Sequence, residues 1–478
     1  MRKSEASPFL EHHGEGPAPL TYMQRTILHI ANLVPDPFRP DPFRRISRAF
    51  SLTGSWNIEW VRQSLQAVIH RHASLRTRFV LVDGQPLQQV DQPREFFLPT
   101  VEVSGASAAG IHAEAHRLVQ EFTEQGIELS IGPLFNARIF ILADDHYLLV
   151  FCIDHIITDA RSMAVLSQEF LTLYAGYVHG SPPVLAPVAL SMIDIARSQR
   201  RTQDAWMKEH ARYWKQRFAD APHPRFPSDP SPANEDAGVT EGEIHFGPEL
   251  TTRLRHLSRT LRTSLSTTVF AIYVALLSRW CNQLDLVVCL VSGGRHRIEY
   301  QNIHGLFAYP LFLRVQLNPD DSFVRLVERV SNEIMAAYKH DDRGQLPLLM
   351  PELQHAGSFN WQTFEAPKLR TSESGPVVAQ AAERASGASP PQLKPVECLV
   401  RYPAREALNG MNRKLPAALA WRQMLFLHDR PDEISGYIRS PAMSLAPASV
   451  ERFVRNFLSL AEQFCDAPLC RVSAARCT

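Results

Sequence analysis

Apolar residues recur at helical spacing through the first part of the chain. They stand about every third or fourth position in residues 21–33, and more regularly in residues 56–75. This is the pattern of a helix that buries one face. The same spacing predicts helices over residues 108–124 and 162–180, and a glycine ends the last of these, as is common at helix C-termini.

Runs of β-forming residues separate these helices. Residues 77–90 hold two such runs around Asp83-Gly84, a dipeptide that suits the tight turn of a hairpin. Two longer runs meet at Asp144-Asp145, and the second of them reads YLLVFCID. The pattern therefore predicts two pairs of strands, and the last strand ends in polar residues.

The second half of the chain repeats this mixture. It predicts strands over 241–247, 285–291, 306–317 and 434–439, and helices over 248–262, 266–281, 321–340 and 447–465. Residues 221–238 are rich in Pro, Asp and Ser, and residues 371–395 are poor in bulky apolar side chains, so we expect loops in both. Two halves that each combine a sheet with helices predict a pseudo-duplicated α/β sandwich, that is, an α+β fold.

A proline-rich crossing divides the two halves. Three prolines within residues 182–187 interrupt the pattern, and a short helical run around Trp206 follows. We therefore expect an N-terminal lobe at residues 1–185 and a C-terminal lobe at residues 186–478.

The composition is that of a folded globular protein. The chain has 478 residues, 45% hydrophobic and 21% charged, which is too long for a single core. Its 50 Lys and Arg nearly balance 49 Asp and Glu, so no overall charge favours nucleic acid or a membrane.

No secretion signal and no apolar run of membrane-spanning length is present, and we expect a cytoplasmic monomer. Seven cysteines without CxxC spacing argue against a zinc site and a disulfide framework.

The strand that ends at Asp154 leads to the strongest candidate chemistry. His155 follows it directly, and a histidine held rigidly with one free ring nitrogen can act as a general base near neutral pH. Asp159 stands four residues later, just before a predicted helix. On this pattern alone, Asp159 could instead be a helix cap and His155 a hydrogen-bonded core residue.

Six segments in order resemble the condensation domains of nonribosomal peptide synthetases. They are PLTYMQRTIL (19–28), RHASLRTRF (71–79), DHIITDARS (154–162), VSGGRHR (291–297), HGLFAYPLFLR (304–314) and the stretch from DRPDEISGYI to AEQF (429–464). The resemblance covers nearly the whole chain. It implies two lobes like chloramphenicol acetyltransferase, arranged in a V with a tunnel between them.

The resemblance also implies roles for the site residues. The histidine nearest the chemistry in the family motif His-His-x-x-x-Asp-Gly falls on His155. Asp159 corresponds to an architectural aspartate that pairs with Arg295, and Arg76 to a position that is usually structural. Asp154 replaces the first motif histidine; because neighbours on a strand point to opposite faces, we expect it to face away and bind backbone amides or an arginine.

We expect the substrate tunnel to be lined by Ala160, Ser162, Ser292, Gly293 and Tyr309. Two of these depart from the family pattern. Ala160 stands where the motif has glycine, which narrows the channel by a methyl group, and Tyr309 stands where an asparagine is common. Ser162 is retained.

The resemblance implies an acyltransferase that looks free-standing, since the two lobes consume the chain. It would take an acyl or peptidyl group from the phosphopantetheine thioester of a carrier protein, or from acyl-CoA, and pass it to a small amine or alcohol. No metal and no permanently bound cofactor is expected. Two alternatives stay open: a catalytically impaired domain that docks carrier proteins or tailoring enzymes, and an epimerase-like enzyme. The latter needs a second acid/base, and residues 306–315 contain no carboxylate.

Overall fold

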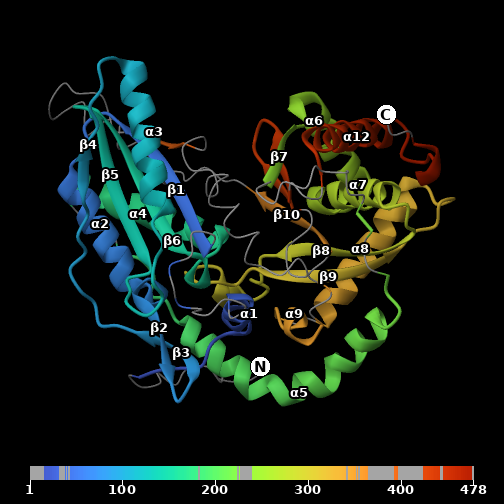
Figure 1. The fold of residues 1–478 in the computed structure, drawn as a ribbon, viewed down its shortest axis with the longest axis horizontal. Helices are drawn as coiled ribbons and strands as arrows, with labels where there is room; N and C mark the ends of the chain where they lie inside the picture. The colour runs from blue at the N-terminus through green and yellow to red at the C-terminus, as the bar shows by residue number, and fades with distance from the viewer. Residues whose placement is uncertain are drawn as a thin grey trace, which may run out of the picture. The chain divides into compact units, whose positions relative to one another are not determined.

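The structure of the protein is a computed structural model. It describes residues 16–31, 38, 40, 44–180, 184–222, 225–226, 239–340, 343–350, 353, 356–363, 392–396, 424–441 and 445–475. The chain forms two compact units (Figure 1). Unit 1 comprises Met1–Thr202, Arg295–Phe307 and Glu365–Ala407, and unit 2 comprises Gln203–Gly294, Ala308–Phe364 and Leu408–Thr478. The division into lobes after residue 185 stays a prediction, but the segment with Arg295 groups with unit 1.

Unit 1 is built on a five-stranded sheet. In spatial order its strands are β11 (Gln392–Val396), β1 (Arg45–Thr53), β6 (His146–Asp154), β5 (Phe135–Ala143) and β4 (Thr100–Glu102). Strand β6 pairs antiparallel with β1 on one side and with β5 on the other. This central place accounts for its nearly continuous apolar sequence, since both of its faces are covered.

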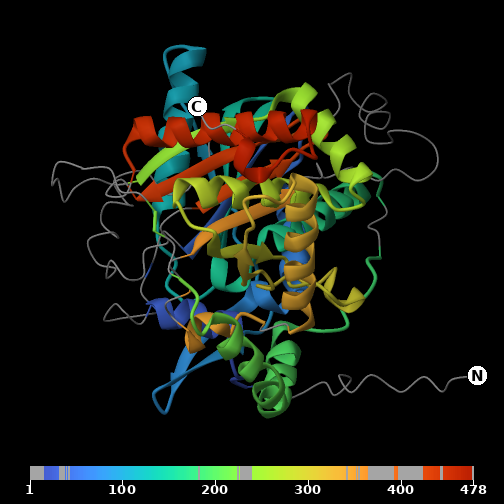
Figure 2. The same cartoon turned by 90° about the vertical axis from the view of Figure 1, so that its right-hand side faces the viewer.

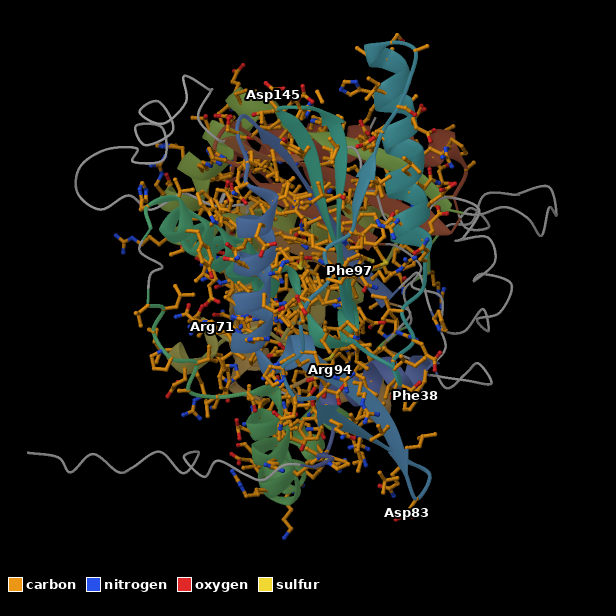
Figure 3. All side chains as sticks on the ribbon, turned by 90° about the vertical axis from the view of Figure 1, so that its left-hand side faces the viewer. Phe38, Arg71, Asp83, Arg94, Phe97 and Asp145 are labelled. Atoms are coloured by element: carbon orange, nitrogen blue, oxygen red, sulfur yellow. The ribbon has the colours of Figure 1, made fainter. Side chains whose placement is uncertain are left out.

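Four α-helices and a hairpin lie wholly within the described part of unit 1. The helices are α1 (Tyr22–Ala31), α2 (Ile58–Arg71), α3 (Ala108–Glu124) and α4 (Ala160–Val178), and the hairpin pairs β2 (Thr77–Val82) with β3 (Gln85–Val90). These are the elements that the periodicity predicts. Asp83 and Gly84 both have positive φ, as a two-residue hairpin turn requires. Asp83 and Asp145 mark hairpin tips at opposite ends of the unit (Figure 3).

Unit 2 contains a six-stranded sheet. Its order is β7 (Val239–His245), β13 (Ile434–Pro441), β12 (Met424–Asp429), β10 (Gly357–Thr363), β8 (Asp285–Ser292) and β9 (Tyr309–Gln316). The α-helices that lie wholly within its described residues are α6 (Gly247–Thr260), α7 (Leu265–Trp280), α8 (Phe323–Lys339), α9 (Leu346–Leu349) and α12 (Pro447–Asp466). Helix α12 packs against α7 and β7, and Figure 2 shows it running alongside α7. Eleven successive residues of α7, 268–278, are buried, so this helix is the centre of the unit's core.

The structure differs from the sequence-based prediction in a few elements. Helix α5 (Met192–Phe218) has 27 residues, where a short helical run is predicted around Trp206. Strands β1 and β10 are not predicted, because their apolar positions lie among polar ones. Strand β12 is not predicted either, because its run of four apolar residues is too short for periodicity to separate a strand from a buried helix. The predicted loops at 221–238 and 371–395 lie mostly outside the described residues, although β11 begins within the second.

The described cysteines include Cys152 in β6 and Cys289 in β8, and both side chains are buried. Among the described residues, no single helix is long and apolar enough to cross a membrane. The pair α6 and α7 meets that test together by length and composition, with a bend of 104° between them.

Candidate active site

Strand β6 leads directly into the turn that carries His155. Residues 148–154 are all buried, and the chain then makes a short 3-10 turn, His155–Ile157, before α4 begins. Asp159 caps α4, and its carboxylate accepts a hydrogen bond from the Ser162 backbone N–H at 2.7 Å. The sequence left open whether Asp159 is a helix cap, and the structure shows that it is. The cap fixes where the turn ends.

His155 is partly exposed, whereas the residues on both sides of it are buried. Its Nδ1 lies 2.7 Å from the main-chain carbonyl oxygen of Thr158. Because a carbonyl oxygen can only accept, Nδ1 must carry the proton. In the neutral ring Nε2 then has a lone pair, and no described residue makes a hydrogen bond to it. The imidazole is thus oriented by one nitrogen, and the other is left to act on a ligand.

Asp154 is fully buried beside the turn. Its carboxylate accepts hydrogen bonds from Arg44 Nε at 3.2 Å and from the Ile156 backbone N–H at 3.0 Å. An arginine and a backbone amide are the two kinds of partner that we expect for an Asp154 that faces away from His155. Burial raises the pKa of Asp154 to about 6, although the charge of Arg44 opposes the shift. These contacts are structural. That Asp154 supports the site stays a prediction.

Replacing Asp154 by Asn should remove one pH dependence of stability. In the unfolded chain the pKa of an aspartate is about 3.9, so the folded state holds this proton more tightly. Ionisation between about pH 4 and pH 6 therefore weakens the fold as the pH rises, by about 3 kcal/mol in total. Urea unfolding from pH 4 to pH 7 should show the wild type losing stability relative to Asp154→Asn. The control is Asp145→Asn, at an exposed position; parallel stability curves for wild type and Asp154→Asn would contradict the prediction.

Asp159 and Arg295 form a buried ion pair within unit 1. Arg295 Nη2 lies 3.1 Å from one carboxylate oxygen of Asp159 and 3.4 Å from the other. The two side chains are 3% and 5% exposed, so water screens the pair very little. Asp159 also accepts from the Phe307 backbone N–H at 2.9 Å, and the Arg295 guanidinium lies over the Phe307 ring at 4.2 Å. The pairing implied by the resemblance is present, and it joins the start of α4 to the segment Arg295–Phe307.

Ser162 adds hydrogen bonds between α4 and the segment Arg295–Phe307. Its hydroxyl accepts from Arg295 Nη2 at 2.7 Å, and it bonds both the carbonyl (2.6 Å) and the N–H (2.9 Å) of Gly305. The side chain has no exposed surface. We predict from the sequence that Ser162 lines the substrate tunnel, but these contacts use its hydroxyl completely, so we place it with the supporting residues.

His304, to which the sequence pattern gives no role, lies behind the His155 turn. Its Nε2 is 3.2 Å from Thr158 Oγ1, and its Nδ1 is 2.9 Å from Ser74 Oγ. The His72 ring lies 5.9 Å away, centroid to centroid, and is bonded to Glu169 at 2.7 Å. The one signal in the sequence is that His304 begins the segment HGLFAYPLFLR. Its partners are too far away along the chain to be identified from the pattern.

The other predicted residues of unit 1 have separate surroundings. Arg76 donates to the main-chain carbonyls of Ile69, His70 and Asp91, so it ties the end of α2 to the chain after β3. These are structural contacts, consistent with the supporting role that we predict. Ala160 is the first residue of α4 and is partly exposed, close to the candidate base in sequence.

Ser292, Gly293 and Tyr309 belong to unit 2. Ser292 and Tyr309 face each other across the pair β8 and β9, and both are buried. Ser292 Oγ accepts from the Gly294 N–H at 3.2 Å, and a side chain at Gly293 would meet open space. Their place along a substrate tunnel stays a prediction.

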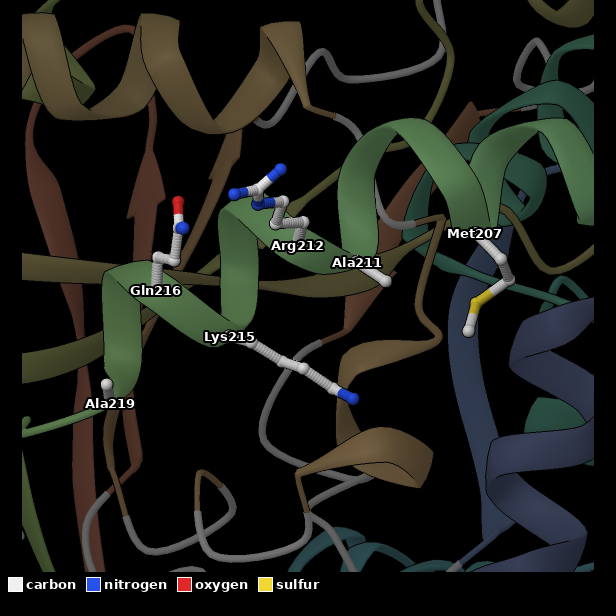
Figure 4. A pocket seen from close by; sticks show the side chains of 6 residues that line it. All are labelled: Met207, Ala211, Arg212, Lys215, Gln216 and Ala219. Atoms are coloured by element: carbon white, nitrogen blue, oxygen red, sulfur yellow. The ribbon is translucent and has the colours of Figure 1, made fainter.

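Unit 2 has an open hollow along one face of α5 (Figure 4). It is lined by Met207, Ala211, Arg212, Lys215, Gln216 and Ala219. The hollow contains none of the predicted site residues. Within the described part of the chain, no three His, Cys, Asp or Glu residues are arranged to hold a metal ion.

Comparison with known proteins matches most of this chain. Residues 15–361 match the family described as Condensation domain. A linear gramicidin synthase of Brevibacillus parabrevis is 31% identical over 352 residues, which is 73% of this chain and 7% of that protein. Phosphinothricin tripeptide synthetase PhsC of Streptomyces viridochromogenes is 27% identical over 460 residues, 95% of this chain and 40% of that protein. The chain therefore spans well under two thirds of these relatives.

Solved structures match over almost the full length. The X-domain from teicoplanin biosynthesis aligns with a TM-score of 0.75 at 20% identity, covering 98% of this chain and 100% of that one. A complex of the X-domain with OxyB gives 0.75 at 19%, covering 99% of each chain. SgcC5 from Streptomyces globisporus gives 0.72 at 21%, covering 95% of this chain and 100% of that one. At these identities the likeness shows the fold, and it confirms the predicted mixture of helices and sheets of the chloramphenicol-acetyltransferase type.

Proposed function

Since this chain belongs to the condensation-domain family of nonribosomal peptide synthetases, as its motifs predict, we propose that it is an acyltransferase. It takes an acyl or peptidyl group from the phosphopantetheine thioester of a carrier protein. It passes this group to a small amine or alcohol and forms an amide or an ester. The observation that carries the proposal is the hydrogen bond from His155 Nδ1–H to the Thr158 carbonyl, which leaves Nε2 as a base.

The chemistry that this ring supports is simple. The amine or hydroxyl attacks the thioester carbon, a C–N or C–O bond forms, and the nucleophile's proton passes to His155 Nε2. The C–S bond then breaks, and the departing thiolate takes the proton from the imidazolium. No bond between the acyl group and the protein is needed. The phosphopantetheine arm is part of the substrate, and holding two reactants in the right geometry supplies much of the rate.

The buried residues around the turn support this role without touching substrate. Asp159, Arg295 and Ser162 are nearly fully buried and bonded to one another, so they hold the start of α4 and the preceding turn in place. Their side chains therefore serve as the fixed frame for His155.

A second candidate function is docking. One matching structure is a complex of the teicoplanin X-domain with OxyB, so that domain binds another protein. Ala160, Asp154 and Tyr309 depart from the family motif here, as expected for a site under less chemical demand. In this case the chain would bind carrier proteins or tailoring enzymes and transfer nothing.

The test uses carrier proteins loaded with different acyl groups, and a panel of amines and alcohols. We expect mass spectrometry to show the acyl mass leaving the carrier only when both an acceptor and the enzyme are present, and a new amide or ester to appear. Acyl-CoA replaces the loaded carrier in a parallel series, which identifies the donor class. Tight carrier binding without transfer to any acceptor would contradict the acyltransferase and favour docking.

A further inference from the structure

Two buried polar side chains lie directly behind the turn that carries His155. Thr158 has no exposed surface and His304 is 2% exposed. Thr158 Oγ1 lies 3.2 Å from His304 Nε2, and His304 Nδ1 lies 2.9 Å from Ser74 Oγ. The proposed chemistry uses neither side chain, since both are buried.

The protons in this cluster have one consistent arrangement. Ser74 Oγ also lies 2.7 Å from the His304 carbonyl oxygen, which can only accept, so the single Ser74 proton is used there. Ser74 Oγ must then accept from His304 Nδ1–H. His304 Nε2 is left as an acceptor, and the Thr158 hydroxyl donates to it. The alternative acceptor for Thr158, the Asp159 carbonyl, is 3.5 Å away, which is too long for a good O–H···O bond.

This arrangement requires a neutral His304. Burial is the main cause that lowers the pKa of His304 well below its usual 6.5, and the charges of His72 and Arg295 act in the same direction. A protonated ring would present a donor to the Thr158 hydroxyl and force that hydroxyl toward its distant alternative. His304 therefore stays neutral, and these hydrogen bonds keep the same donors and acceptors, across the neutral pH range.

Thr158 connects this cluster to the candidate base. Its side chain is fixed by His304, and its carbonyl accepts the proton of His155 Nδ1 at 2.7 Å. We propose that His304 is a positioning residue: by holding the Thr158 hydroxyl it fixes the carbonyl that keeps the His155 proton on Nδ1 and leaves Nε2 free. Its effect on acyl transfer rests on the proposed function, but its effect on the His155 ring does not.

The first experiment changes Thr158, which connects His304 to His155. Thr158→Val keeps the size of the side chain and the main-chain carbonyl but removes the hydroxyl, and Thr158→Ser restores the hydroxyl. The ¹⁵N NMR signals of His155, in the full chain with labelled histidine rings, are identified by their loss in His155→Ala. We expect wild type and Thr158→Ser to show a protonated Nδ1 and a bare Nε2, and Thr158→Val to show signals averaged between the two tautomers. Wild-type signals in Thr158→Val would overturn the proposal.

The second experiment uses a matched pair at position 304. His304→Gln places an amide near Nε2, within reach of Thr158, whereas His304→Asn places it near Nδ1, within reach of Ser74. We expect the His155 signals to stay unchanged in the Gln variant and to average in the Asn variant. In the transfer assay the Asn variant should turn over about tenfold more slowly at unchanged KM, the equivalent of one lost hydrogen bond.

The outcomes separate this proposal from the proposed function. Equal slowing in both variants with unchanged His155 signals would mean that the ring only fills space, and would overturn the positioning role. If wild type transfers nothing, the acyltransferase fails, and the ¹⁵N signals of the Thr158 and His304 variants still decide whether His304 holds the His155 tautomer.

Discussion

His155→Ala is expected to lower the rate of acyl transfer by about 10²- to 10⁴-fold, the usual contribution of a general base. The loss should appear in kcat, because in the proposed mechanism His155 accepts the proton that leaves the nucleophile during the reaction and does not contact the bound carrier. The assay is single-turnover loss of the acyl mass from a loaded carrier protein at saturating acceptor. Carrier binding, measured separately, should stay at the wild-type level.

The control for this variant is His146→Ala, at the opposite end of the same strand. His146 bonds the Ser51 hydroxyl at 3.0 Å and has no contact with the turn. Both variants lose one hydrogen bond, so both should lose about 1 kcal/mol of stability in urea unfolding. Equal transfer rates in wild type and His155→Ala would show that this imidazole is not the base.

Asp159→Ala should reduce the free energy of unfolding by about 3–5 kcal/mol, because it leaves the buried Arg295 without its counter-charge. Arg295→Met should cost a similar amount by stranding the carboxylate. The double variant should cost clearly less than the sum, since no buried charge is then left alone. Urea unfolding of all four proteins gives this coupling directly.

The matched pair for comparison is Arg471 with Asp320, whose side chains are 69% and 72% exposed. Asp320→Ala should unfold at the wild-type urea concentration, because an exposed ion pair contributes little. If Asp159→Ala also unfolded at the wild-type urea concentration, the buried pair of Asp159 and Arg295 would not stabilise the fold as its burial indicates. Additive losses in the double variant would count against direct coupling.

The sequence predicts local structure well wherever a single segment holds the whole signal. The hairpin at Asp83-Gly84 and the buried strand β6 follow from turn chemistry and from an unbroken apolar run. Strand β1 escapes prediction because its buried Phe50 and Leu52 stand among arginines and serines. What places it is pairing with β6, about a hundred residues later, and periodicity does not report such pairing.

The candidate site shows the same limit. Asp159 and Arg295 can be paired only through the resemblance to a family, since 136 positions separate them. The contact between Thr158 and His304 spans 146 positions, and that between Ser74 and His304 spans 230. No short pattern marks either of them. The sequence alone does not distinguish His304 from the other histidines, because its hydrogen-bond partners are brought to it only by folding.

The grouping of Arg295–Phe307 with unit 1 restricts how this protein can be divided or recombined. A fragment that stops at Thr202 would contain Asp159 but lack the guanidinium, the Gly305 main chain and the imidazole that complete its surroundings. A hybrid chain that exchanges only the N-terminal half would pair the aspartate of one parent with the arginine segment of the other. Recombinant chains should therefore take both stretches from the same parent.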